Sequence, residues 1–274
     1  MRHLVIAFLS VGLLGCQPSE PAMPSVPVEQ VRADLQVISN ARVFFGHQSV
    51  GRDLLKAVDA LARESGVALP ITELNARKRI EGKGLFHAVV GRNGDPASKL
   101  ADFMASASKG EDAFDLALLK FCYVDLDDGS KELSPAKIFE HYQRDIGRLR
   151  AAQPELAVLH ATMPLMSDPP GWKTTVKRWL GRPTWRDDAH RRRAAYNEQL
   201  RAHVPEEALF DIARLESTRS DGEQSVFDAG GKRIETMVLD YTYDGGHLNE
   251  PANRRIAAEF IHSMAEALRR SQRE

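Results

Sequence analysis

The chain has 274 residues, and its 37 lysines and arginines nearly balance its 38 aspartates and glutamates. A formal net charge of −1 excludes the strong positive field that nucleic-acid-binding proteins present, so no nucleic-acid partner is expected. The length suits one α/β domain with a full hydrophobic core.

The first residues form a targeting segment. A short polar start precedes an apolar stretch at 4–14, which is too short to span a bilayer as a stable helix. The tetrapeptide at 13–16, Leu-Leu-Gly-Cys, resembles a bacterial lipobox, which implies that Cys16 is lipidated and becomes the mature N-terminus. An ordinary export signal or a membrane anchor is the alternative interpretation.

The lipobox resemblance implies a lipoprotein signal peptide at 1–16 and a palmitate-bearing anchor that ties the chain to the bacterial cell envelope. Gln17, not aspartate, follows the cysteine. In a two-membrane host this pattern implies the outer membrane, facing the periplasm. Residues 17–27 are proline-rich, which is typical of a tether. With Cys16 lipidated, Cys122 has no disulfide partner and is expected to be a small buried hydrophobe.

Residues 28–274 are interpreted as one domain in which helices alternate with strands. Apolar periodicity and turn residues predict the elements in chain order. The first half contains a helix at 28–39, a strand at 41–45, a helix at 50–65, a strand at 67–74, an irregular glycine-bearing stretch at 75–95, a helix at 96–106 and a buried strand at 114–121. The second half contains a helix at 135–152, a strand at 156–163, an insertion at 168–188, a helix at 189–204, a short strand at 208–215, an irregular stretch at 217–243 with a hairpin around Gly230-Gly231, and a helix at 251–270. The alternation predicts a parallel sheet with helices on both faces.

Ser49 follows a strand and a glycine turn at Gly46 and precedes a helix. A serine in that position lies at a helix N-terminus and at the carboxyl end of a strand, where ligands bind in open α/β folds. The helix-end N–H groups there favour developing negative charge. The alternative is that Ser49 only caps the helix.

Asp244 and His247 are the best candidates to activate a serine. A serine hydroxyl is a poor nucleophile at neutral pH and needs a base, which in turn needs an orienting group. The glycine pair between Asp244 and His247 lets the backbone turn, so that both side chains can point to one place. Turn and cap roles are the alternative for both residues.

Four pieces of the domain resemble the SGNH/GDSL esterase–lipase superfamily. The turn around Ser49 is similar to its nucleophile block, and residues 244–249 with the closing helix are similar to its terminal Asp-x-x-His block. Tyr-Asn-Glu-Gln-Leu at 196–200 resembles the helix that precedes its penultimate strand, and Asp211 resembles an aspartate on that strand.

This resemblance implies a three-layer α/β/α fold whose five-stranded parallel sheet has the flavodoxin-like order 2-1-3-4-5. It implies Ser49 as the nucleophile, His247 as the base and Asp244 as the group that orients the base, with no cofactor and no metal. The switch point of this order lies between the first and third strands, so Ser49 and the loop at 122–125 are expected to flank one crevice.

The residues expected around the oxyanion depart from the family pattern. Gly94 is the best match for the glycine whose N–H contacts the oxyanion, with Gly91 as a rival. In the third block only Asp125 is kept, and Val124 stands where an asparagine donor is usual.

Three residues are candidate substitutes for the missing donor: His47, Gln48 and Tyr123. A structural hydrogen bond within the turn is the alternative for His47.

The insertion at 168–188 holds all three tryptophans among lysines and arginines. It is expected to be a lid or a wall for substrate, because aromatic faces suit sugars or acyl chains and arginines suit anions. A packed surface loop and amphipathic contact with the membrane are the alternatives. The spacing Asp187-Asp188-x-His190 indicates a solvated helix start more than a metal site.

The function expected from these features is a serine esterase that removes O-acyl groups, acetyl first, from cell-envelope carbohydrate. Lipid esters are the second substrate class. An O-acyltransferase with the same triad, and a non-catalytic glycan-binding lipoprotein of the same fold, are the alternatives.

Overall fold

The structure is a computed structural model that describes residues 26–74, 80–108, 114–127, 134–168, 171–182, 184–228 and 230–273. The predictions for Cys16, the signal peptide and nearly all of the tether lie outside these residues. Val26 is buried against the core, so the folded domain includes this last part of the predicted tether.

The central sheet is parallel and is built around β1. Its five strands run in the order β2-β3-β1-β4-β5, with bounds Ile71–Glu73, Gly84–Val89, Arg42–His47, Leu116–Leu119 and Ala157–Val158. The next strand, β6 (His160–Ala161), is separated from β5 by one residue. It pairs in parallel with β7 (Leu209–Phe210). The last two predicted strands are therefore neighbours.

The predicted five-stranded parallel sheet and its order 2-1-3-4-5 are confirmed, with one addition. The strand β3 lies between the predicted first and second strands, within the stretch expected to be irregular. Leu85 and Phe86 of β3 are buried on opposite faces of the sheet. Glycines on either side of this short apolar run hid it, because glycine is typical of loops.

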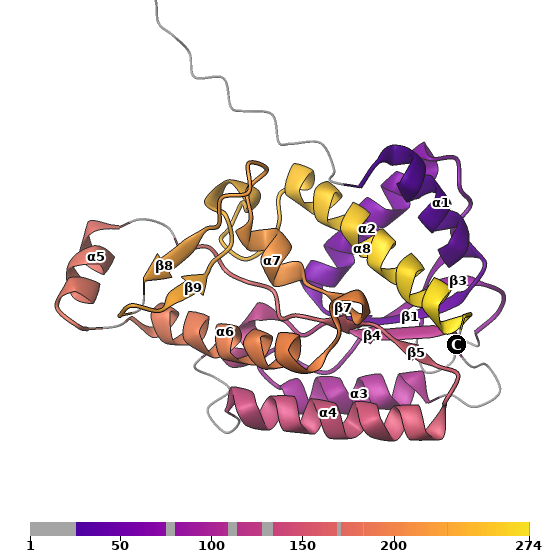
Figure 1. Ribbon diagram of the computed structural model, residues 1–274, viewed down its shortest axis with the longest axis horizontal. Helices are drawn as coiled ribbons and strands as arrows, with labels where there is room; N and C mark the ends of the chain where they lie inside the picture. The colour runs from indigo at the N-terminus through magenta and orange to yellow at the C-terminus, as the bar shows by residue number, and fades with distance from the viewer. Residues whose placement is uncertain are drawn as a thin grey trace, which may run out of the picture.

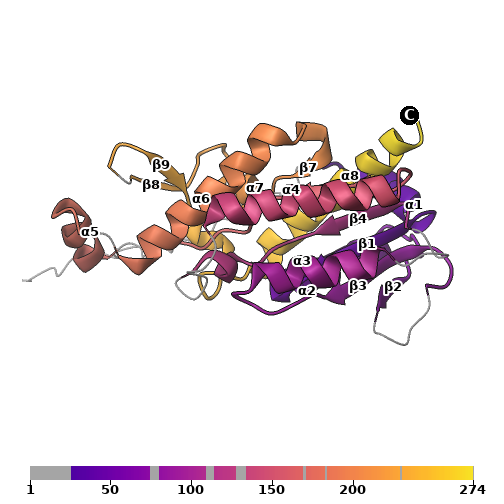
Figure 2. The ribbon, with the colours of Figure 1, turned by 90° about the horizontal axis from the view of Figure 1, so that it is seen from below.

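Two helical layers cover the sheet (Figure 1, Figure 2). One layer consists of α1 (Val28–Ser39), α2 (Ser49–Glu64) and α8 (Glu250–Ser271). The other consists of α3 (Pro96–Ala107), α4 (Pro135–Ala152) and α6 (Trp185–His203).

The alternation of side chains along β1 supplies both cores. Val43 and Phe45 pack into the layer of α1, α2 and α8, whereas Phe44 packs into the opposite layer. All three side chains are fully buried. Because successive side chains of a strand point to opposite faces, this one apolar run fixes β1 at the centre of the three-layer fold.

Short elements connect and extend this frame. They are η1 (Tyr123–Leu126), α5 (Trp172–Trp179), η3 (Glu206–Ala208), α7 (Ile212–Ser217), the hairpin of β8 (Val226–Asp228) and β9 (Arg233–Glu235), and η4 (Leu239–Tyr241). The predicted hairpin around Gly230-Gly231 is confirmed. Within the described ranges, no helix has the length and apolar character needed to cross a membrane.

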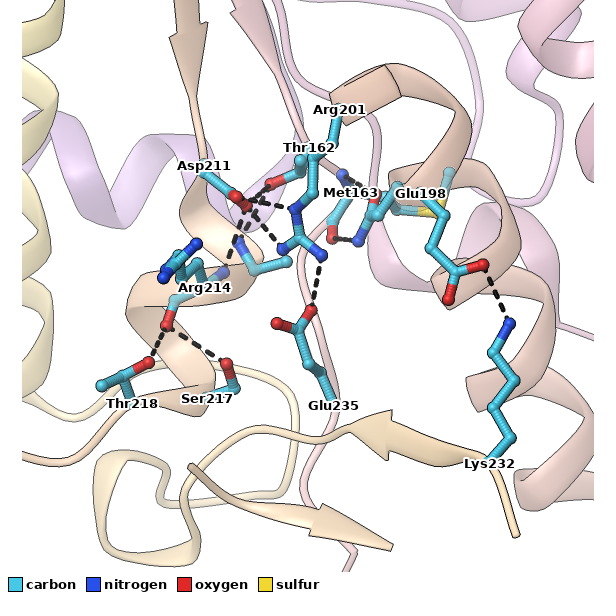
Figure 3. A network of polar contacts seen from close by, with 12 residues as sticks. Thr162, Met163, Glu198, Arg201, Asp211, Arg214, Ser217, Thr218, Lys232 and Glu235 are labelled. Atoms are coloured by element: carbon cyan, nitrogen blue, oxygen red, sulfur yellow. Dashed lines mark hydrogen bonds and ion pairs between the residues drawn. The ribbon is translucent and has the colours of Figure 1, made fainter. Parts of the chain in front are cut away.

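Asp211 corrects the predicted strand at 208–215, which ends at Phe210. The Asp211 carboxylate accepts a hydrogen bond from the Arg214 backbone N–H and so caps α7. It also pairs with Arg201 of α6, whose guanidinium reaches Glu235 of β9 at 2.8 Å (Figure 3). One arginine therefore ties α6, α7 and the hairpin together.

His160 of β6 is a buried titratable group in the fold. Its Nδ1 lies 2.8 Å from the Tyr142 hydroxyl, and Arg150 approaches its Nε2 at 3.3 Å. Burial, helped by the charge of Arg150, lowers the pKa of His160 from 6.5 to about 4. The unfolded chain takes up this proton near pH 6.5, and the folded chain does so only near pH 4. The stability that depends on His160 is therefore present above pH 6.5 and is lost as the pH falls from 6.5 towards 4.

Replacing His160 with glutamine removes this titration and keeps a side chain that can hydrogen-bond Tyr142. We expect the loss of unfolding free energy between pH 7 and pH 5 to be smaller in His160→Gln by about 1–2 kcal/mol. Urea unfolding of both proteins at the two pH values measures the difference. An identical loss in both proteins would contradict the assignment.

Candidate active site

Ser49, His247 and Asp244 form a continuous chain of hydrogen bonds. The Oγ of Ser49 lies 3.0 Å from Nε2 of His247, and Nδ1 of His247 lies 2.7 Å from Oδ2 of Asp244. The serine is the first residue of α2 and is separated from β1 by Gln48 alone, and the other two residues come from the loop before α8. The structure thus brings together the three residues that the sequence singled out.

The carboxylate of Asp244 determines the protonation of the His247 ring. A carboxylate accepts hydrogen bonds, so Nδ1 of the imidazole carries the proton that faces it. In the neutral ring Nε2 is then the acceptor, and it faces the hydroxyl of Ser49. This is the orientation in which an imidazole can remove the serine proton.

The loop of Asp244 holds its own carboxylate in place. Its Oδ1 accepts hydrogen bonds from the backbone N–H groups of Gly246, at 2.9 Å, and His247, at 2.7 Å. Burial opposes ionisation, but these bonds and the contact with the His247 ring outweigh it and hold the pKa of Asp244 below its ordinary value. The residue that orients the ring is therefore kept ionised.

Thr242 and Tyr123 shape this loop from two sides. The Thr242 hydroxyl donates to the His247 carbonyl at 2.6 Å and accepts from the Gly245 N–H at 2.8 Å. A Cβ at Gly246 would lie 2.6 Å from the Tyr123 ring, so only glycine lets the ring pack there. The His247 ring contacts the Tyr123 ring edge-on, with 5.7 Å between the ring centroids. It stacks on the Tyr243 ring, with 6.0 Å between the centroids.

His47 corrects one of the expected oxyanion roles. The ring is fully buried, and Nδ1 lies 2.8 Å from the carbonyl of Gln48, while Nε2 lies 3.0 Å from His87. Burial is the main cause that lowers the pKa of His47 to about 3, so the ring is neutral. The hydrogen bond from the His47 ring to the Gln48 carbonyl fixes the peptide between Gln48 and Ser49. It thereby also fixes the direction of the Ser49 N–H. The structure contains the hydrogen bond within the turn that was the alternative for His47.

The Gln48 side chain is likewise engaged in structure. Its Nε2 donates to the carbonyls of Val90, at 2.5 Å, and Gly91, at 3.1 Å. The amide therefore ties the serine turn to the loop that leaves β3, and is not turned to a substrate. The expectation that Gln48 contacts the oxyanion is not met in this geometry.

Gly94 and Asp125 are bonded to each other. The Gly94 N–H donates to Oδ1 of Asp125 at 3.0 Å, and the rival Gly91 N–H donates to Asp102 at 2.8 Å. Asp125 is fully buried and pairs with Lys99 at 2.6 Å. Neither glycine N–H is available to an oxyanion here, and Asp125 is part of the framework. The sequence could not show this, because the partner of Asp125 lies 26 positions away on another element.

Asn93 was not among the residues that the sequence singled out, and it lies in the same loop as Gly94. Its Oδ1 accepts a hydrogen bond from the Lys99 ammonium at 3.0 Å. The two N–H donors of the amide are thereby turned away from that cation. Its neighbour Gly94 donates to the buried carboxylate of Asp125, which anchors the loop that carries Asn93. An asparagine directly before the predicted glycine was the signal available in the sequence.

The predicted solvated helix start at 187–190 is wrong for two of its residues. Asp187 is buried, forms a capping box with Thr184 and pairs with Arg178. His190 is also buried, and its pKa is lowered to about 3, chiefly by burial. Both side chains belong to the packed base of the insertion.

Possible metal ligands come together at one other place among the described residues. Asp34, His262 and Glu266 place one ligand atom each within 4.8 Å of one another. The guanidinium of Arg269 lies 2.7 Å from Asp34 and 2.6 Å from Glu266. A positive charge therefore already satisfies these carboxylates, and the cluster clamps α1 to α8.

Comparisons with known proteins find similarity in solved structures alone. No protein-family model and no curated protein matches this chain. A "putative acylhydrolase" from Bacteroides fragilis NCTC 9343 is 13% identical, with 84% of this chain and 87% of that chain covered and a TM-score of 0.47. A carbohydrate esterase family 3 structure from Talaromyces cellulolyticus is 12% identical, with 84% and 97% covered and a TM-score of 0.41. An acetyl esterase mutant with acetate ion is 13% identical, with the same coverage and a TM-score of 0.42.

Substitution of Gly51 tests how closely the turn that positions Ser49 is packed. A Cβ at Gly51 would lie 2.3 Å from the Cβ of His47, whereas a Cβ at Gly147 in α4 would meet nothing within 4 Å. We expect Gly51→Ala to destabilise the fold and displace the serine turn, and Gly147→Ala to stabilise it by about 1 kcal/mol through helix propensity. Thermal unfolding measures both changes. Equal effects of the two substitutions would contradict the close packing of the turn.

Proposed function

We propose that the protein is a serine ester hydrolase that works through an acyl-serine intermediate. The observation that carries the proposal is the hydrogen-bonded chain from Ser49 through His247 to Asp244. Ser49 Oγ attacks the ester carbonyl carbon while Nε2 of His247 takes its proton. Collapse of the tetrahedral intermediate breaks the bond to the alcohol oxygen, which receives the proton from His247. Water, activated by the same ring, then hydrolyses the acyl-serine.

The oxyanion of the intermediate requires donors close to Ser49. The Ser49 N–H is one, because it belongs to the first turn of α2 and its peptide is fixed by His47. We assign the second donor to the side-chain amide of Asn93, whose oxygen is held by Lys99. In this proposal Asn93 replaces the donor that Val124 cannot provide.

The proposed substrate is a small O-acyl ester, with acetyl esters of envelope carbohydrate first and lipid esters second. Tyr123 and Tyr243 flank the His247 ring, and the Tyr243 side chain is 68% exposed beside it. An exposed aromatic face next to the catalytic base suits the apolar face of a sugar ring. Lipidation at Cys16, inferred from the sequence, would place the enzyme at the cell envelope where such esters occur.

Replacement of the triad residues tests the mechanism. We expect Ser49→Ala and His247→Ala to lower kcat for short p-nitrophenyl esters by roughly 10⁴-fold or more, because either change removes the activated nucleophile. A fluorophosphonate probe should label the native protein and not Ser49→Ala. The matched control is Ser39→Ala, which removes an exposed hydroxyl in α1 and should leave both readouts unchanged.

Three outcomes would contradict this function. Full activity in Ser49→Ala would remove Ser49 as the nucleophile. Labelling at Ser49, with product formed only when an acceptor sugar is present, would identify an O-acyltransferase. Retained glycan binding with no labelling would identify a binding protein of the same fold.

Substitution of Asn93 tests the second oxyanion donor. We expect Asn93→Ala to lower kcat by about 10²–10³-fold with little change in KM, since the bond forms in the transition state. Asn40→Ala, at the exposed end of α1, is the control and should have native kinetics. An unchanged kcat in Asn93→Ala would move the assignment to the hydroxyl of Tyr123, which Tyr123→Phe then tests.

A further inference from the structure

The helix α5 is an exposed amphipathic element with no buried residue. The exposed fractions of Trp172 and Trp179 are 75% and 84%, and those of Val176 and Leu180 are 45% and 55%. Large apolar side chains gathered at this level of exposure mark an interaction surface on a soluble domain. Figure 1 and Figure 2 both show α5 at one end of the molecule, projecting away from the sheet.

These four side chains share one face of the helix. Their spacing of i, i+4, i+7 and i+8 places them in a single stripe. Arg178 lies on the opposite face and holds the helix to the body through Asp168, at 2.7 Å, and through Asp187. Its guanidinium also covers the Phe227 ring at 4.6 Å. The apolar stripe is therefore turned outwards by a partly buried ionic contact on the inner side.

The charge around the stripe is of one sign. Residues 171–186 contain five cationic side chains and no acidic one, in a chain whose formal net charge is −1. The acidic partners of Arg178 lie outside this range, and four cations remain around the tryptophans: Lys173, Lys177, Arg182 and Arg186. A surface that complements this segment must be negatively charged and must accept apolar side chains at the same time.

We propose that α5 is a docking element for an anionic lipid bilayer, lying in the plane of the headgroups. Tryptophan side chains favour the membrane–water interface, and lysines that flank an apolar stripe are attracted to anionic lipids. Trp185, which is 51% exposed at the start of α6, extends the same arm. The arm is defined as α5 with Leu180 and Trp185.

The chain that precedes the arm is hydrogen-bonded to the loop that carries Asp244 and His247, and to the segment before η4. The Ser167 N–H donates to the Gly245 carbonyl at 2.9 Å, and the Met237 N–H donates to the Met166 carbonyl at 3.0 Å. Gly245 lies between Asp244 and His247, so docking of the arm would hold the site beside the bilayer. This last step rests on the proposed function, whereas the docking itself does not.

Tryptophan fluorescence tests the docking directly, because the chain contains three tryptophans and all three belong to the arm. The full chain is reconstituted into vesicles of phosphatidylcholine, with or without phosphatidylglycerol. The emission reports the arm even where the N-terminal segment already holds the chain on the vesicle. With phosphatidylglycerol we expect a shift to shorter wavelength and quenching by brominated lipid, both reversed by high salt.

Variants that keep all three tryptophans test the charge attraction and the apolar contact separately. Lys173→Glu/Lys177→Glu should lower the equilibrium constant for insertion of the arm by at least about tenfold, because each lysine contributes about fivefold at an anionic surface. Val176→Asp should also reduce quenching. The matched control is Val28→Asp, an equally apolar side chain that is 63% exposed on α1 and should insert like the native chain.

The outcomes separate this inference from the proposed function. Ser49→Ala should show the native fluorescence shift, since docking requires no chemistry. The proposal is overturned by unchanged emission on anionic vesicles, or by equal quenching of the native and charge-reversed chains. It is also overturned if a soluble acylated glycan, and not the vesicle, shifts the emission, because the arm would then be a wall for substrate.

Discussion

The hydrogen bond between Ser49 and His247 is the constraint on which the rest of the site depends. It joins residues 198 positions apart, one at the start of α2 and the other just before α8. These two helices pack in the same apolar core, and the Asn253 amide of α8 donates to the Asp53 carbonyl of α2 at 2.7 Å. The packing of these two helices therefore helps to determine the relative position of Ser49 and His247.

A second support reaches the base from the opposite helical layer. Arg193 of α6 is fully buried and donates to the Tyr123 carbonyl at 2.9 Å and to Asp127 at 2.8 Å. Tyr123 in turn packs against Gly246 and the His247 ring. The ring is thus held between the two layers, so substitutions in the distant α6 should act on the site through η1. Such residues would position the His247 ring without touching a substrate.

The sequence predicted those parts of the structure that local patterns encode. The alternation of apolar runs gave the parallel sheet, and the chemistry of serine activation pointed to Ser49, Asp244 and His247. Burial and long-range pairing were not visible. Asp125 resembled a substrate-facing residue because its partner Lys99 lies on another helix. His47 is buried because α2 packs over the end of β1. The strand β3 was missed because glycines flank its apolar run.

In the proposed mechanism Ser49 carries the acyl group during turnover. Mass spectrometry of the protein after acid quenching from an acetylated sugar substrate measures this directly. We expect one added acetyl group on the peptide that contains Ser49, and its absence from Ser49→Ala. Hydrolysis of the same substrate with no acylated Ser49, or with the acetyl group on another residue, would contradict it.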